Sequence, residues 1–165
     1  KVEVSELKTE SIVKSLHGYK LDLGLLALPV SDPQLTSIDL FSEPFLLALP
    51  QSYKQSKIKN LGDLKNRDLL LLEEGHCLRD QALAFCHEKG VKGPADVRAT
   101  SLETLRALII NNMGYSLMPK MAAYADKGIV YKKLKPESVR HIGLIFRHTA
   151  PQVLLFKAIA DKIMK

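Results

Sequence analysis

Residues 69–86 read LLLLEEGHCLRDQALAFC, and this stretch combines three structural signals. The leucine run at 69–72 predicts an apolar strand, and Glu-Glu-Gly at 73–75 predicts a turn after it. A helix is expected to begin near Cys77. The stretch also holds the only two cysteines of the chain, Cys77 and Cys86. A strand that leads through a turn into a helix is the repeating unit of α/β folds.

Strands and helices are also predicted to alternate on the N-terminal side of this stretch. Thr9 is expected to cap a helix over residues 10–17, which Gly18 ends. The other elements predicted there are strands at 2–7, 21–28 and 38–49 and a short helix over 61–66. The nearly continuous apolar run at 21–28 suits a parallel strand covered on both faces.

The same alternation continues on the C-terminal side. Residues 100–103, Thr-Ser-Leu-Glu, match a capping box that opens a helix through Asn111. A final amphipathic helix is predicted over residues 151–164, with Leu155, Ile159 and Ile163 on its apolar face. The remaining features predicted are a break at 90–94 and strands at 97–99, 115–118, 129–133 and 140–147. This pattern predicts an α/β fold with parallel sheets.

Two positions indicate that the chain passes twice between lobes. Proline cannot donate a hydrogen bond to a ladder, so the strand over 38–49 is expected to bend or change sheet at Pro44. The strand that begins at Arg140 would bring the chain back. We therefore expect a discontinuous first lobe, residues 1–42 and 140–165, and a continuous second lobe, residues 43–139.

Composition narrows the class of protein. The chain has 165 residues, and a hydrophobic content of 46% is enough for a packed core. No apolar run could cross a bilayer, and two cysteines do not resemble a secreted disulfide scaffold, so we expect a cytoplasmic protein with free thiols. The formal charge is +6, but the lysines are scattered and no helix-turn-helix pattern is visible. This chain is therefore not expected to bind DNA by itself. Because its first residues already resemble a strand, we expect a fragment of a longer protein.

The surroundings of the two cysteines differ. Cys77 is expected at a helix N-terminus beside His76 and Arg79, and all three features favour the reactive thiolate. An accessible thiolate is the form that peroxide oxidises to a sulfenic acid, which condenses with a second thiol. Cys86 follows Phe85 on an apolar stretch and is expected to be a buried small hydrophobe.

The spacing of the cysteines predicts a conformational switch. If residues 77–86 form one helix, nine steps separate the cysteines by about 13.5 Å and place them on opposite faces. A disulfide needs Cα atoms within about 7 Å, so the bond cannot close unless the segment unwinds. Oxidation and refolding would then be one event.

Other uses of these residues are disfavoured. A metal site built from His76, Cys77, Cys86 and His87 would need residues on opposite helix faces to converge, so no metal and no cofactor is expected. An inert, buried Cys77 fits poorly with the polar Gly-His-Cys-x-Arg sequence. Thr9 as a simple helix cap and Arg140 as a surface arginine remain open alternatives to any functional role.

Four stretches resemble the LysR-type transcriptional regulators, and in particular their peroxide-sensing members. They are residues 75–81 with Phe85-Cys86 after them, residues 98–106, residues 39–44 and residues 142–147. The similarity runs across essentially the whole chain, and the cysteine motif is the most specific part of it.

The resemblance implies a two-lobed regulatory domain like a type II periplasmic binding protein, beginning at its second strand. The first strand and helix and the DNA-binding domain would be absent. It further implies that Cys77 is the peroxide-reactive cysteine and Cys86 its disulfide partner. By the same resemblance, His76 and Arg79 would support the reactive sulfur, while Thr9 and Arg140 would help to place peroxide.

The resulting prediction is a hydrogen peroxide sensor and not an enzyme. It would self-associate as a dimer or tetramer, reach DNA only through a domain absent from this chain, and be reset by thioredoxin-type or glutaredoxin-type reductants. One alternative is a domain that binds a small metabolite between its lobes, with Thr100-Ser101 holding a carboxylate at a helix N-terminus. A thiol peroxidase is the other, which the cysteine separation disfavours.

Overall fold

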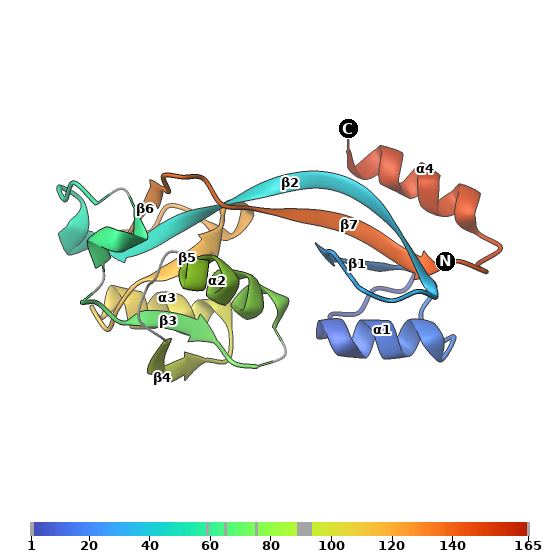
Figure 1. The fold of residues 1–165 in the computed structure, drawn as a ribbon, viewed down its shortest axis with the longest axis horizontal. Coiled ribbons are helices and arrows are strands. Elements are labelled where there is room, and N and C mark those ends of the chain that lie inside the picture. Colours follow the sequence, from blue (N-terminus) through green and yellow to red (C-terminus); the bar gives the residue numbers. More distant parts are fainter. Residues whose placement is uncertain (1, 59, 65, 75, 89–93, 165) are drawn as a thin grey trace. The chain divides into compact units, whose positions relative to one another are not determined.

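The chain divides into two compact units in the computed structural model (Figure 1). The structure describes residues 2–58, 60–64, 66–74, 76–88 and 94–164. One unit consists of Lys1–Ser42 with Arg140–Lys165, and the other is Glu43–Val139. Gly75 and most of the break predicted at 90–94 lie outside the described residues.

A five-stranded sheet contains both chain crossings between these units. Its order is β1 (Gly24–Leu28), β7 (Val139–Arg147), β2 (Leu35–Pro50) and β5 (Ser116–Pro119), and β6 (Ile129–Lys133) also pairs with β2. β1 is antiparallel to β7, and β2 is antiparallel to β5 and β6. The prediction of parallel strands is therefore wrong for this sheet.

Pro44 lies within β2 and does not end it. Pairing with β5 begins at Phe45 and pairing with β6 begins at Leu46, so the residue without an N–H falls just before these ladders. β2 consequently runs as one strand of 16 residues, longer than the predicted 38–49 segment.

The first unit packs α1 (Thr9–His17) on β1. The fully buried Leu16 of α1 meets Leu26 and Ile145 of the sheet. Two expectations are wrong here. Residues 2–7 form no strand, and Val4 is 93% exposed, because no neighbouring strand pairs with them. Thr9 is the first helical residue, and Lys8 occupies the N-cap position without a side-chain bond.

The last helix, α4 (Val153–Ile163), also belongs to the first unit, and its apolar face differs from the predicted one. Phe156 and Ala160 are its buried residues, and the Phe156 ring packs on Phe146 of β7 with centroids 5.1 Å apart. Leu155 is 57% exposed, and Ile163 is exposed as well, whereas the predicted Ile159 is partly buried against the core. The buried stripe thus lies one position further along the helix than we predicted.

The second unit combines parallel strands with helices. β3 (Leu69–Leu72) is parallel to β4 (Pro94–Ala99), and α2 (Cys77–Glu88) and α3 (Leu102–Ile110) both contact β3. All four leucines of β3 are buried, as expected for a strand covered on both faces. The described residues of this unit also form 3₁₀ helices at Gln51–Tyr53, Leu61–Leu64 and Lys120–Ala122.

Candidate functional site

Both cysteines lie on α2, as predicted. Cys77 is its first residue, Cys86 follows nine residues later, and both are free thiols. Nine residues of α-helix correspond to a rise of about 13.5 Å. The two sulfurs therefore cannot bond while α2 is intact.

The Cys86 end of α2 belongs to the hydrophobic core. Leu78, Ala82 and Cys86 recur every four residues and form the buried stripe of the helix. Cys86 is 2% exposed, and burial raises the pKa of its thiol from the ordinary 9.0 to about 11. In this position Cys86 stays protonated at neutral pH and cannot act as a nucleophile.

The Cys77 end has a polar setting. Cys77 is half-buried and precedes the buried stripe by one residue, which rotates it about 100° from Leu78. The Arg79 guanidinium lies 3.5 Å from a Glu74 oxygen and 3.6 Å from an Asp80 oxygen. Glu74 also meets Arg98 of β4 at 2.9 Å. Charged groups thus surround the N-terminal turn that carries Cys77.

Arg79 is more buried than its partners, with 14% of its side chain exposed. Its Nε is buried and has no hydrogen-bond acceptor among the described residues. His76 is half-buried, and its backbone carbonyl accepts a hydrogen bond from the Arg79 amide at 2.9 Å. The start of α2 therefore places a histidine, a cysteine and an arginine within one turn.

The other two predicted residues belong to the first unit. Thr9 begins α1, and Arg140 is the second residue of β7. The structure thus groups Cys77, Cys86, His76 and Arg79 in the second unit and places Thr9 and Arg140 in the first.

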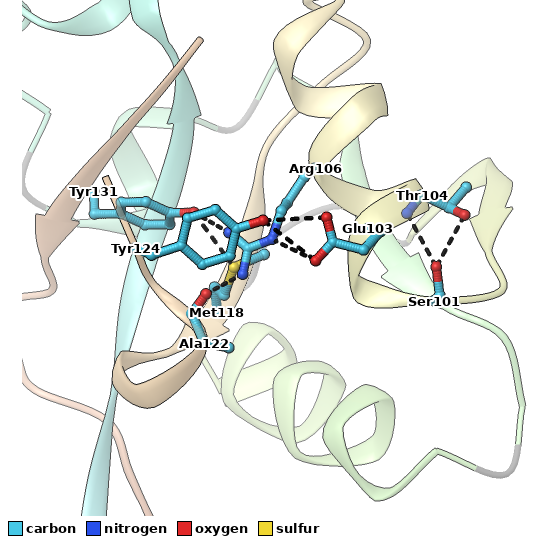
Figure 2. A network of polar contacts seen from close by, with 8 residues as sticks. All are labelled: Ser101, Glu103, Thr104, Arg106, Met118, Ala122, Tyr124 and Tyr131. Atoms are coloured by element: carbon cyan, nitrogen blue, oxygen red, sulfur yellow. Dashed lines mark hydrogen bonds and ion pairs between the residues drawn. The ribbon is translucent and has the colours of Figure 1, made fainter. Parts of the chain in front are cut away.

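Sequence reasoning missed a buried cation on the neighbouring helix α3. Arg106 is 3% exposed, donates to the Tyr131 hydroxyl at 2.5 Å and to the Ala122 carbonyl, and lies 3.9 Å from the Tyr124 ring centroid (Figure 2). Glu103 pairs with it at 3.4 Å. An arginine between Leu105 and Ile109 on an otherwise apolar helix face was the available signal.

The start of α3 differs from the predicted capping box. Ser101 is the N-cap, and its hydroxyl accepts a hydrogen bond from the Thr104 amide at 3.1 Å. Glu103, the expected box partner, points instead to Arg106 and Tyr124 (Figure 2). The cap therefore lies one residue later than the box based on Thr100.

In the described part of the chain, no three His, Cys, Asp or Glu residues form a group that could hold a metal ion. Among the same residues, no helix has the length and apolar character needed to cross a membrane.

Comparison with curated proteins points to one kind of regulator. The chain is 37% identical over 164 residues to the DNA-binding transcriptional dual regulator OxyR of Escherichia coli K12. It is 31% identical over 165 residues to a hydrogen peroxide-inducible genes activator of Haemophilus influenzae. Each alignment covers 96% of this chain but 54% of the relative, so the chain spans about half the length of these proteins.

Solved structures give the same result for the fold. The crystal structure of the reduced form of OxyR matches with a TM-score of 0.86 and 34% identity, covering 97% of this chain and 78% of that one. The oxidized form matches with a TM-score of 0.86 and 36% identity, covering 99% and 80%. These neighbours share the two-lobed α/β architecture of periplasmic-binding-protein-like regulatory domains.

The family assignment follows from the match along the whole chain. The profile of the LysR substrate binding domain covers residues 1–164. We conclude that the chain belongs to the LysR substrate-binding domain family.

Proposed function

We propose that the chain is the hydrogen peroxide-sensing regulatory domain of a LysR-type transcription factor, switched by a Cys77–Cys86 disulfide. The observation that carries this proposal is the placement of two free thiols at opposite ends of α2, one in a polar turn and one in the core. The similarity to OxyR in both its reduced and its oxidized form supports it. Residues 1–42 with 140–165 would be the first lobe, and residues 43–139 the second, redox-active lobe.

The chemistry has two steps that balance. The Cys77 thiolate attacks one peroxide oxygen, and the O–O bond breaks to give Cys77 sulfenic acid and hydroxide. The hydroxide takes up the proton that the thiol released on ionising and leaves as water. The Cys86 thiol then attacks the sulfenic sulfur, so that a disulfide forms and a second water leaves. Because the cysteines begin about 13.5 Å apart, the second step requires α2 to unwind.

Four further residues would assist the first step. Arg79, beside Cys77 in the same turn, would stabilise the thiolate and the departing oxygen, and His76 would donate a hydrogen bond to the reactive sulfur. Thr9 and Arg140 are included through the family resemblance, and we propose that they help to place peroxide.

The proposal extends to the whole protein. Refolding of the 77–86 segment would change how regulatory domains pack in a dimer or tetramer, and DNA-binding domains outside this chain would then be repositioned. Thioredoxin-type or glutaredoxin-type dithiols would reset the switch by thiol exchange in the cytoplasm. One peroxide is consumed per switching cycle, which distinguishes a sensor from a turnover enzyme.

The test is peptide mass mapping of the reduced 165-residue chain after one equivalent of hydrogen peroxide. We expect the loss of both thiols and a linked Cys77–Cys86 peptide. Cys86→Ser should instead leave a sulfenic acid on Cys77 that dimedone traps, and Cys77→Ser should leave Cys86 unmodified. Two free thiols in the wild-type chain after this treatment would contradict the proposal.

Metabolite binding at the start of α3 is the competing function. Thr100 and Ser101 are exposed there, but the Ser101 hydroxyl already caps the helix by accepting from Thr104. A carboxylate at this position would have to displace that cap. A full-length protein lacking both cysteines that still regulates transcription would favour this function over ours.

A further inference from the structure

Tyr115 is a buried tyrosine whose position is set by β3. It is 1% exposed, its amide donates to the Asp68 carbonyl at 3.0 Å, and its carbonyl accepts from the Leu70 amide at 2.8 Å. The preceding Gly114 has φ +158°, and a Cβ there would lie 2.3 Å from the Asp68 oxygen. The backbone of Tyr115 is therefore held by contacts that do not involve α2.

Tyr115 and Cys86 are buried in the same unit, and the Tyr115 hydroxyl has no hydrogen-bond partner among the described residues. Both residues belong to the same core cluster. Burial, and to a lesser extent the Cys86 thiol, raise the pKa of the Tyr115 hydroxyl. No group among the described residues lies within hydrogen-bonding distance of the hydroxyl.

A buried hydroxyl without a partner destabilises the state that buries it. Here that state is the reduced one, in which Cys86 of α2 and Tyr115 are packed in one core. When α2 unwinds and Cys86 leaves, water gains access to the hydroxyl. Because Tyr115 is anchored on β3, it stays behind and its gain in hydration favours the opened state.

We propose that Tyr115 is a positioning residue of the redox switch. Its unpaired hydroxyl destabilises the buried position of Cys86, so that Cys86 leaves the core and reaches Cys77 more easily. The proposal rests on the disulfide function above, which it deepens. It assigns the resolving step, rather than the reaction of Cys77 with peroxide, as the step that Tyr115 controls.

The central variant is Tyr115→Phe, which keeps the ring and removes the hydroxyl. Sulfenic acid formation on Cys77 should keep its wild-type rate, whereas closure of the disulfide should slow about fivefold, the ratio that one unpaired buried hydroxyl produces. Tyr53→Phe is the matched control, because Tyr53 lies in the same unit and stacks with Arg67 at 5.3 Å. A purely structural role would alter both steps, and equal closure rates in wild type and Tyr115→Phe would overturn the proposal.

A second measurement separates this proposal from the proposed function. In a Cys77→Ser background no disulfide can form. The rate at which iodoacetamide alkylates Cys86 then reports how often local unfolding exposes this thiol. Tyr115→Phe should slow this alkylation about fivefold, whereas Tyr53→Phe should leave it unchanged. An unchanged rate with Tyr115→Phe would overturn the role of Tyr115 even if the wild-type chain forms the disulfide. A slowed rate would support the effect of the Tyr115 hydroxyl on the burial of Cys86, even if the wild-type chain does not form the disulfide.

Discussion

The two ends of α2 differ although they carry the same functional group. At the C-terminal end, Cys86 continues the stripe of Leu78 and Ala82 into the core, and burial raises the pKa of its thiol to about 11. At the N-terminal end, Cys77 lies off this stripe, half-buried beside a turn where Arg79 meets Glu74 and Asp80. The difference shows that a shift of one residue away from the buried face of a helix is enough to make a thiol accessible instead of buried and protonated.

The largest expected effect concerns the protection of Cys86. At pH 8 a thiol with a pKa of about 11 is about 0.1% thiolate, whereas an ordinary thiol is about 10% thiolate. Alkylation of Cys86 should therefore be about 100-fold slower in the folded chain than in guanidinium, measured by mass spectrometry of the peptides. Cys77, which is already accessible, should change much less. Similar protection of both cysteines would remove the contrast between the ends of α2.

The same burial predicts a pH dependence of stability. The folded-state pKa of Cys86 is raised from 9.0 to about 11, so folding favours the protonated thiol. Its contribution is fully present below pH 9 and is lost as pH rises to 11, a loss of about 2–3 kcal/mol in the free energy of unfolding. Urea titrations of wild type and Cys86→Ala across this range isolate the effect. If the free energy of unfolding of the two proteins changed with pH in the same way, Cys86 would not lie in a low-dielectric environment.

The polar end can be tested with two arginines that share one partner. Arg79 and Arg98 both pair with Glu74, but only Arg79 lies in the turn that carries Cys77. Arg79→Met should slow the reaction of Cys77 with peroxide about tenfold, because it removes the cation that would stabilise the charge on the departing peroxide oxygen. Arg98→Met should change this rate less than twofold. Equal effects of both variants, in stopped-flow measurements, would point to general surface charge rather than to Arg79.

The smallest effect is expected at α3, outside the redox segment. Ser101→Ala removes the hydroxyl that accepts from the Thr104 amide and should lower the free energy of unfolding by about 1 kcal/mol. The reactivity of both cysteines in the folded chain should remain unchanged. A change in the rate of Cys77 oxidation in this variant would mean that the two helices are more closely coupled than their contacts indicate.

The sequence was sufficient for the elements around the cysteines because their signals are local. The leucine run of β3, the turn after it and the start of α2 at Cys77 all follow from adjacent residues. Strand direction was mispredicted for β1, because an apolar run does not reveal that its partner is the antiparallel β7. The buried face of α4 was missed by one position, since Phe156 and Ala160 have an apolar spacing as good as that of Leu155 and Ile159.

The candidate site was predictable only where one segment supplies it. His76, Cys77, Arg79 and Cys86 are neighbours in the sequence, and the structure keeps them on α2 and the residue before it. The partners of Arg106 come from residues 122, 124 and 131, and Cys86 of α2 is buried in the same core cluster as Tyr115, the residue before β5. Such contacts depend on tertiary packing, which no periodicity in the sequence reports.

The most direct test of the central claim is amide hydrogen exchange of α2 before and after oxidation by hydrogen peroxide. If disulfide formation requires the helix to unwind, the amides of residues 81–88 should be protected in the reduced chain and lose that protection in the oxidised one. Amides of β3 should remain protected in both states. A linked Cys77–Cys86 peptide together with unchanged protection of α2 would contradict the account, because it would mean that the bond closes without refolding.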